Sequence, residues 1–105
     1  MTTVFGNPEP TELRFSCDWP ADFRYVPGLQ ESGATAMADG YAQGSRNAAL
    51  VNVHSTAGIG HALASVFTAF RSQSPLVLTA GQQTRAMFLT EPYLLASDAE
   101  QFPKP

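Results

Sequence analysis

The chain has 105 residues, a formal net charge of -3 at pH 7, and 44% hydrophobic against 14% charged residues; this is typical of a globular domain and excludes a disordered or collagen-like chain. The mild acidity and the lack of any Lys/Arg cluster argue against nucleic-acid binding, and no apolar run reaches the ~20 residues that cross a bilayer. The single cysteine, Cys17, cannot form an internal disulfide, and the N-terminus has no secretory signal pattern, so we expect a cytoplasmic protein.

Apolar segments and helical patterns alternate along the chain. The apolar segment at 2–5 is followed by a weak helical pattern over 9–19, and the segment at 23–26 is followed by a stronger helical pattern over 31–44. The segment at 49–54 is followed by a second strong helical pattern over 57–73, and a last apolar segment covers 75–81. The segments at 49–54 and 75–81 are mostly apolar, as strands covered on both faces tend to be.

Both strong helical patterns have an apolar stripe that we expect to lie in the core. In the first helix the stripe consists of Ala34, Met37, Ala38, Tyr41 and Ala42. In the second helix it consists of Ile59, Leu63, Val66, Phe67 and Phe70. Gly44 is the expected end of the first helix, and Ser55 or Thr56 is the expected N-terminal cap of the second.

The order of these elements predicts the fold class. Strands that alternate with helices favour right-handed crossovers and an open parallel sheet, here an α/β fold with about four strands and helices on both faces. Four strands are few for such a sheet, the first strand begins almost at Met1, and no strand pattern follows 75–81. We therefore expect residues 1–105 to be one domain or part of one, with a fragment favoured.

The loops that follow the four strands hold the polar residues that could act together. In open parallel sheets, ligands bind outside the carboxyl ends of the strands. The candidate residues in these loops are Asn7, Glu31, His54, Ser55 and Gln82. The topology therefore predicts that they converge at one edge of the sheet.

Each candidate also has a purely structural interpretation. Glu31 suits the positive end of its helix, and His54 can hydrogen-bond to backbone at the end of its strand. Gly58 can serve close packing of a helix on the sheet, and Asn7 can form a turn. His61, in the first turn of its helix, is expected to be solvated.

Three stretches of the sequence carry a family resemblance. They are VFGNP from residue 4, QESGATAMADGYAQGSR from residue 30, and VNVHSTAGIGHALASVFTAFRSQSPLVLTAGQQTRAM from residue 51. Over almost the whole chain they resemble the N-terminal, pyrimidine-binding domain of thiamine diphosphate-dependent enzymes, and AGQQTRAM and the position of His54 are similar to the benzoylformate decarboxylases. The likeness implies a partial flavodoxin-like fold that lacks the central domain and the domain that binds Mg²⁺ and the diphosphate.

The resemblance also implies roles for individual residues. Glu31 matches a glutamate that hydrogen-bonds the N1′ nitrogen of the aminopyrimidine and activates thiamine diphosphate; a carboxyl in a dry pocket is expected to have a raised pKa. His54 matches an active-site histidine near a 2-oxo acid substrate, where it can pass protons. The cofactor-binding residues implied by the resemblance are Glu31, Asn7, Pro8, Gly58 and Gln82, and no metal ligand is implied.

The chain departs from the family pattern in two places. In the first loop, Glu9 replaces a glycine, and Pro10 replaces a serine that contacts the substrate carboxylate. Proline has neither a hydroxyl nor a backbone N–H, so that contact cannot form. In the later glycine-containing turn, His61 stands where asparagine is common. These changes leave the substrate open and leave the role of Glu31 untouched.

Three interpretations of the function remain. The first is the pyrimidine-binding part of a benzoylformate decarboxylase-like lyase that acts on a 2-oxo acid, meets the diphosphate-binding domain of another subunit, and forms a homo-oligomer when intact. The second is a truncated, non-catalytic chain that associates with itself or a partner. The third is an unrelated flavodoxin-like nucleotide binder, which the lack of a phosphate-cradling glycine-rich loop disfavours. We expect no decarboxylation by the 105 residues alone.

Overall fold

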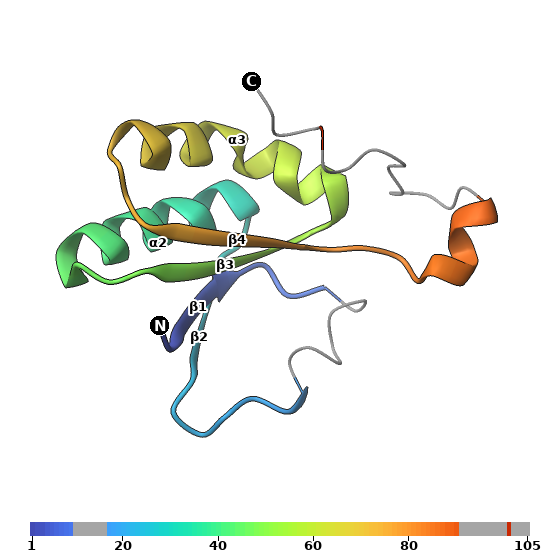
Figure 1. Ribbon diagram of the computed structural model, residues 1–105, viewed down its shortest axis with the longest axis horizontal. Coiled ribbons are helices and arrows are strands. Elements are labelled where there is room, and N and C mark those ends of the chain that lie inside the picture. The colour runs from blue at the N-terminus through green and yellow to red at the C-terminus, as the bar shows by residue number, and fades with distance from the viewer. Residues whose placement is uncertain (10–16, 91–100, 102–105) are drawn as a thin grey trace.

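The computed structural model describes residues 1–9, 17–90 and 101, in which strands and helices alternate (Figure 1). The strands are β1 (Thr3–Gly6), β2 (Arg24–Pro27), β3 (Ala49–His54) and β4 (Leu76–Gly81). The helices are α2 (Glu31–Ser45), α3 (Ser55–Arg71) and the short 3-10 helix η2 (Arg85–Thr90). The predicted strands and both strong helices are confirmed. None of the helices in the described ranges is long and apolar enough to span a membrane.

The strands form one parallel sheet in the order β2-β1-β3-β4. The connections through α2 and α3 both move the chain toward β4, and right-handed crossovers in one direction place their helices on the same face. The two helices accordingly lie side by side on one face of the sheet (Figure 1). The predicted parallel α/β fold is confirmed; of the helices expected on both faces, the one predicted over 9–19 lies mostly outside the described residues.

The core lies between this face of the sheet and the two helices. Val51 and Val53 of β3 are fully buried and belong to one cluster with the alanines of α2. In the predicted stripe of α2, the buried members are Ala34, Ala38 and Ala42, and the exposed members are Met37 and Tyr41. Short alanine side chains let the helix lie close to the strands. The helix continues past the expected stop at Gly44 and ends at Ser45, where Arg46 takes the left-handed conformation.

The aromatic part of the stripe predicted for α3 does not lie in the core. Phe67 and Phe70 are 65% and 75% exposed, whereas the smaller Ala62 and Ala69 are buried. The apolar pattern of this helix is broad, and the alanines let α3 approach the sheet more closely than phenylalanines would. The expectation that these two phenylalanines are core residues is therefore wrong.

The junction between β3 and α3 is strained. His54, rather than Ser55 or Thr56, is the N-terminal cap residue, and it makes no side-chain capping bond. Ser55 is the first helical residue and has a φ of 53°, in the left-handed region that a β-carbon disfavours. Its hydroxyl and that of Thr56 are buried, without a hydrogen-bond partner among the described residues. The expected cap is wrong, and the first turn of α3 carries two buried hydroxyls that no described residue satisfies.

The buried hydroxyl of Ser55 makes this residue a position where a smaller side chain should stabilise the fold. We expect Ser55→Ala to raise the free energy of unfolding by about 1 kcal/mol, because it removes a buried, unpaired polar group and keeps the β-carbon. Urea unfolding followed by circular dichroism measures the change. A loss of stability would show instead that the hydroxyl has a partner, such as a buried water.

Candidate functional site

Glu31, the first residue of α2, lies at the carboxyl-terminal edge of the sheet. It is only 6% exposed, and carboxylates are seldom so buried unless they are paired. Asn7, in the turn after β1, donates a hydrogen bond from Nδ2 to Glu31 Oε1 at 3.3 Å. His61 of α3 places its Nδ1 3.2 Å from Glu31 Oε2. Side chains from two different elements therefore hold both oxygens of the carboxylate.

The sheet brings these residues together from distant parts of the chain. Gly6 at the end of β1 pairs with Pro27 at the end of β2, and the Gly28 amide donates to the Gly6 carbonyl at 2.7 Å. The turn after β1 and the loop before α2 therefore leave the sheet at one edge. β3 is the other neighbour of β1, and α3, which follows β3, packs along α2. Asn7 and Glu31, both expected at this edge, are in contact.

Gly58 leaves room for the Glu31 side chain. A β-carbon at Gly58 would lie 3.4 Å from Cγ of Glu31 and 3.3 Å from Cβ of Val53. Both distances are at the tight limit of ordinary carbon contacts. Any side chain at position 58 would therefore press against the side chain of Glu31. The structure thus places Gly58, a residue predicted for the site, directly against Glu31.

The charge state of Glu31 follows from these contacts. Burial raises the pKa of the carboxyl, but hydrogen bonds from its own backbone, from Asn7 and from His61, together with the charge of His61, lower it by more. The pKa of Glu31 therefore lies below its ordinary value of 4.5, and the group is a carboxylate at neutral pH. The expectation of a raised pKa is wrong for the described chain, because the donors outweigh the loss of solvent.

His61 is the site residue that sequence reasoning did not assign. It was expected to be solvated, and its side chain is 71% exposed, yet its ring reaches a carboxylate side chain that is 8% exposed. Residues three apart share a helix face, so His61 lies on the same face as Gly58. Two features of the sequence could have assigned His61 to the site: its spacing from Gly58, and the histidine at a position where the family pattern has asparagine.

His54 and Gln82 lie at the carboxyl ends of β3 and β4, at the same edge of the sheet as Glu31. His54 ends β3 and pairs with Gly81, the last residue of β4, so Gln82 comes directly after the paired strand ends. The Oε1 atom of Gln82 is buried and has no hydrogen-bond partner in the described part of the chain. A buried acceptor without a partner costs free energy. A bound ligand that donates a hydrogen bond to this oxygen would remove that cost.

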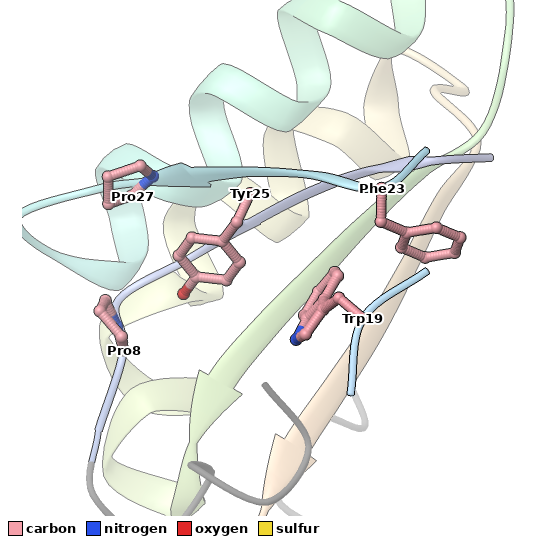
Figure 2. Close-up of a pocket in the computed structure, with 5 residues that line it drawn as sticks. All are labelled: Pro8, Trp19, Phe23, Tyr25 and Pro27. Atoms are coloured by element: carbon pink, nitrogen blue, oxygen red, sulfur yellow. The ribbon is translucent and has the colours of Figure 1, made fainter. Parts of the chain in front are cut away.

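Pro8 lines a separate apolar pocket. The pocket has a volume of about 460 Å³ and is lined by Pro8, Trp19, Phe23, Tyr25 and Pro27. Figure 2 shows Trp19 and Phe23 on one side of Tyr25, with the two prolines on the other. The ring centroid of Trp19 lies 5.5 Å from that of Phe23 and 5.7 Å from that of Tyr25, in edge-on geometry. The turn after β1 thus directs Asn7 to Glu31 and Pro8 to this pocket.

Comparison with known proteins agrees with this arrangement. Residues 1–99 match the family described as thiamine pyrophosphate enzyme, N-terminal TPP binding domain. The chain is 50% identical over 105 residues to benzoylformate decarboxylase from Pseudomonas aeruginosa. It is similar to the crystal structure of benzoylformate decarboxylase from Polynucleobacter necessarius, with 48% identity and a TM-score of 0.94. It also resembles a thiamine diphosphate-dependent 4-hydroxybenzoylformate decarboxylase from Rhodococcus jostii RHA1, with 47% identity and a TM-score of 0.94.

These alignments cover this chain much more fully than they cover the relatives. They include 100%, 100% and 99% of this chain, but 20% of each relative. The chain therefore spans about a fifth of the length of the proteins it matches. The similarity therefore supports the fold of these 105 residues and does not extend to the rest of the relatives.

Proposed function

Because the chain belongs to the thiamine pyrophosphate enzyme family, with a match to its N-terminal TPP binding domain, we propose that it is the pyrimidine-binding part of a thiamine diphosphate-dependent 2-oxo acid decarboxylase. The observation that carries the proposal is the buried carboxylate of Glu31, held at both oxygens at the carboxyl edge of a parallel sheet. Ligands of open parallel sheets bind at this edge. A carboxylate whose orientation is set before binding loses little freedom when it meets a ring nitrogen.

The residues at this edge fit a heteroaromatic ring with polar nitrogens. Each oxygen of Glu31 keeps acceptor capacity beyond the contact with Asn7 or His61. Gln82 adds a buried carbonyl oxygen with no partner in the described ranges. We propose that Glu31 and Gln82 hold the aminopyrimidine, that Asn7 and Gly58 position Glu31, and that Pro8, as the next residue in the turn, fixes the direction of Asn7.

Glu31 would act through its charge. Because its pKa is lowered, it is an anion at neutral pH and favours the protonated form of a ring nitrogen that donates to it. When bound, thiamine diphosphate supplies the electron sink that decarboxylation of a 2-oxo acid requires. A ring that covers Glu31 also displaces water from it, which strengthens the attraction between the carboxylate and the ring proton.

His54 is our candidate for the substrate side of the site. It lies at the end of β3, directly before the strained Ser55. An imidazole there can donate a hydrogen bond to a 2-oxo acid or accept a proton from it. Strained backbone gathers at functional sites, so the φ of Ser55 supports a role for this junction in orienting His54.

The substrate class rests on the relatives. Those compared above are named as decarboxylases of benzoylformate and 4-hydroxybenzoylformate, which supports an aryl 2-oxo acid as the substrate. Pro10 offers no hydrogen-bond donor for the substrate carboxylate. We therefore propose that a different residue meets that carboxylate in this protein.

A second domain is needed to complete the cofactor site. We propose that the Mg²⁺ ion and the diphosphate are held by the diphosphate-binding domain of another subunit.

Phe67 and Phe70, three residues apart on α3, are exposed on a single helix face, and such apolar patches mark interaction surfaces. A truncated chain that only self-associates would use the same surface but would bind no cofactor. A longer protein that sediments as a monomer would contradict the subunit pairing.

Calorimetric titration tests the proposal on the chain itself. We expect weak binding of thiamine diphosphate in the presence of Mg²⁺, and a loss of at least about tenfold in affinity for Glu31→Gln, because a hydrogen bond to a charged group is removed. Asp22→Asn, which removes the same charge at an exposed loop position, should bind like the wild type. Equal affinities of the wild-type and Glu31→Gln chains would contradict the role of Glu31.

A further inference from the structure

The two side chains that hold Glu31 differ in their chemistry. Asn7 donates to Oε1 through a neutral amide, whereas the Nδ1 atom near Oε2 belongs to the titratable ring of His61. The His61 side chain is 71% exposed and the Glu31 side chain 8% exposed. Protons from solvent therefore reach the imidazole directly, while the carboxylate that it contacts is buried.

We propose that His61 is a positioning residue for Glu31: its ring holds the carboxylate in place and ionised, and so extends to lower pH the range over which Glu31 can bind the aminopyrimidine. The consequence for binding deepens the proposed function and rests on it. The pairing of His61 with Glu31 stands on geometry alone, so the two can be tested apart.

The helix face that carries His61 is shaped for this contact. Gly58, one turn earlier on α3, leaves space for Cγ of Glu31, and His61 then meets the carboxylate at the end of that side chain. Among the causes that shift the pKa of Glu31, burial raises it, and the hydrogen bond and charge of His61 are two of those that lower it. An asparagine, as in the family pattern, can supply the hydrogen bond but not the charge.

The other charged or titratable groups on the neighbouring elements are placed elsewhere or are already engaged. On α2, Asp39 lies two turns beyond Glu31 and accepts hydrogen bonds from Gln43 and Ser74. On α3, Arg71 lies in the last turn, about 15 Å of helix beyond His61. His54 ends β3 just before α3 begins. The charge of His61 is one of the causes that lower the pKa of Glu31.

The sign of the pH dependence follows from the two groups. The hydrogen bond and the charge of His61 both favour the ionised form of Glu31. The pKa of Glu31 is lowered, so the carboxylate persists as the pH falls below 4.5 and the pair is lost only in stronger acid. Cofactor binding through the Glu31 carboxylate should therefore persist to a lower pH in the wild type than in a variant without His61.

The test compares the wild-type 105-residue chain with three variants and uses a fourth for signal assignment. Carbon-detected NMR of side-chain carboxyl groups, with the Glu31 signal assigned by its absence in Glu31→Gln, follows the titration of Glu31. In His61→Asn the midpoint should shift upward, because the donor stays and the charge is lost; in His61→Leu it should shift further, because both are lost. Arg71→Gln removes a positive charge from the same helix and should leave the midpoint unchanged.

Calorimetry then separates this inference from the proposed function. As the pH is lowered, thiamine diphosphate binding should weaken at a lower pH for the wild type than for His61→Asn, because the carboxylate of the variant is protonated first. An unshifted Glu31 midpoint in His61→Asn, or an ordinary midpoint in the wild type, overturns the inference even if the cofactor binds. A shifted midpoint without any cofactor binding supports the pairing and instead overturns the proposed function.

Discussion

The Gly6→Ala variant is expected to lose about 3 kcal/mol of its free energy of unfolding, a large fraction of the roughly 5–15 kcal/mol that stabilises a folded domain. A β-carbon at Gly6 would lie 2.5 Å from the backbone oxygen of Asn52 and 2.6 Å from the hydroxyl oxygen of Tyr25. Gly6 and Asn52 are paired residues of β1 and β3, so relief of the first clash would separate two central strands. Gly6 is required here because of close packing.

Gly40 provides the matched control for this prediction. It lies on the exposed face of α2, and a β-carbon there would have no neighbour within 4 Å. Gly40→Ala should therefore raise the free energy of unfolding by up to about 1 kcal/mol through helix propensity. Urea unfolding of both variants by circular dichroism gives the comparison. A Gly6→Ala chain as stable as the wild type would mean that β1 and β3 tolerate a shift at this edge.

The second large effect is expected at Glu31 in the longer protein that contains this domain. Glu31→Gln should lower kcat for decarboxylation of an aryl 2-oxo acid by about 10²–10⁴-fold, the usual contribution of a residue that positions a proton. Glutamine nearly matches the size of glutamate and can still meet Asn7, but it carries no charge and cannot favour a protonated ring nitrogen.

The controls for this substitution distinguish chemistry from folding. The unfolding midpoint of Glu31→Gln should stay near that of the wild type at acidic pH, because the protonated carboxyl of the wild type is then neutral, as the glutamine amide is at every pH. At neutral pH the wild type should be the more stable, since a lowered pKa means that the ionised form favours the fold. Wild-type turnover by Glu31→Gln, with the cofactor bound, would remove Glu31 from the mechanism.

Much of the site could be predicted because parallel sheets converge. The strands at 3–6, 24–27, 49–54 and 76–81 follow from short apolar runs that end in turn residues. Once the strands are parallel, their carboxyl ends share an edge, so the predicted topology alone brings Asn7 and Glu31 to the same place, where the structure shows them in contact. The burial of the alanines of α2 could likewise be predicted, because apolar residues that recur with the helical period mark a buried face.

Other features depended on contacts between segments that are distant in sequence. The direction of the pKa shift of Glu31 depends on donors from two other elements, and sequence reasoning considered burial alone. His61 lies thirty positions after Glu31, and only the packing of α3 along α2 brings its ring to the carboxylate. The exposure of Phe67 and Phe70 depends on which face of α3 meets the sheet.

The sequence by itself therefore determined the strands and the two long helices, the parallel arrangement of the sheet, and the edge at which Glu31 lies. Periodicity and turn chemistry are local properties, and the handedness of crossovers turns them into a topology. Only the tertiary structure decided that Asn7 and His61 hold opposite oxygens of Glu31, that Pro8 faces an aromatic pocket, and that Ser55 is strained. These depend on side-chain positions a few ångströms apart, which are set by the packing of α2 and α3 on the sheet.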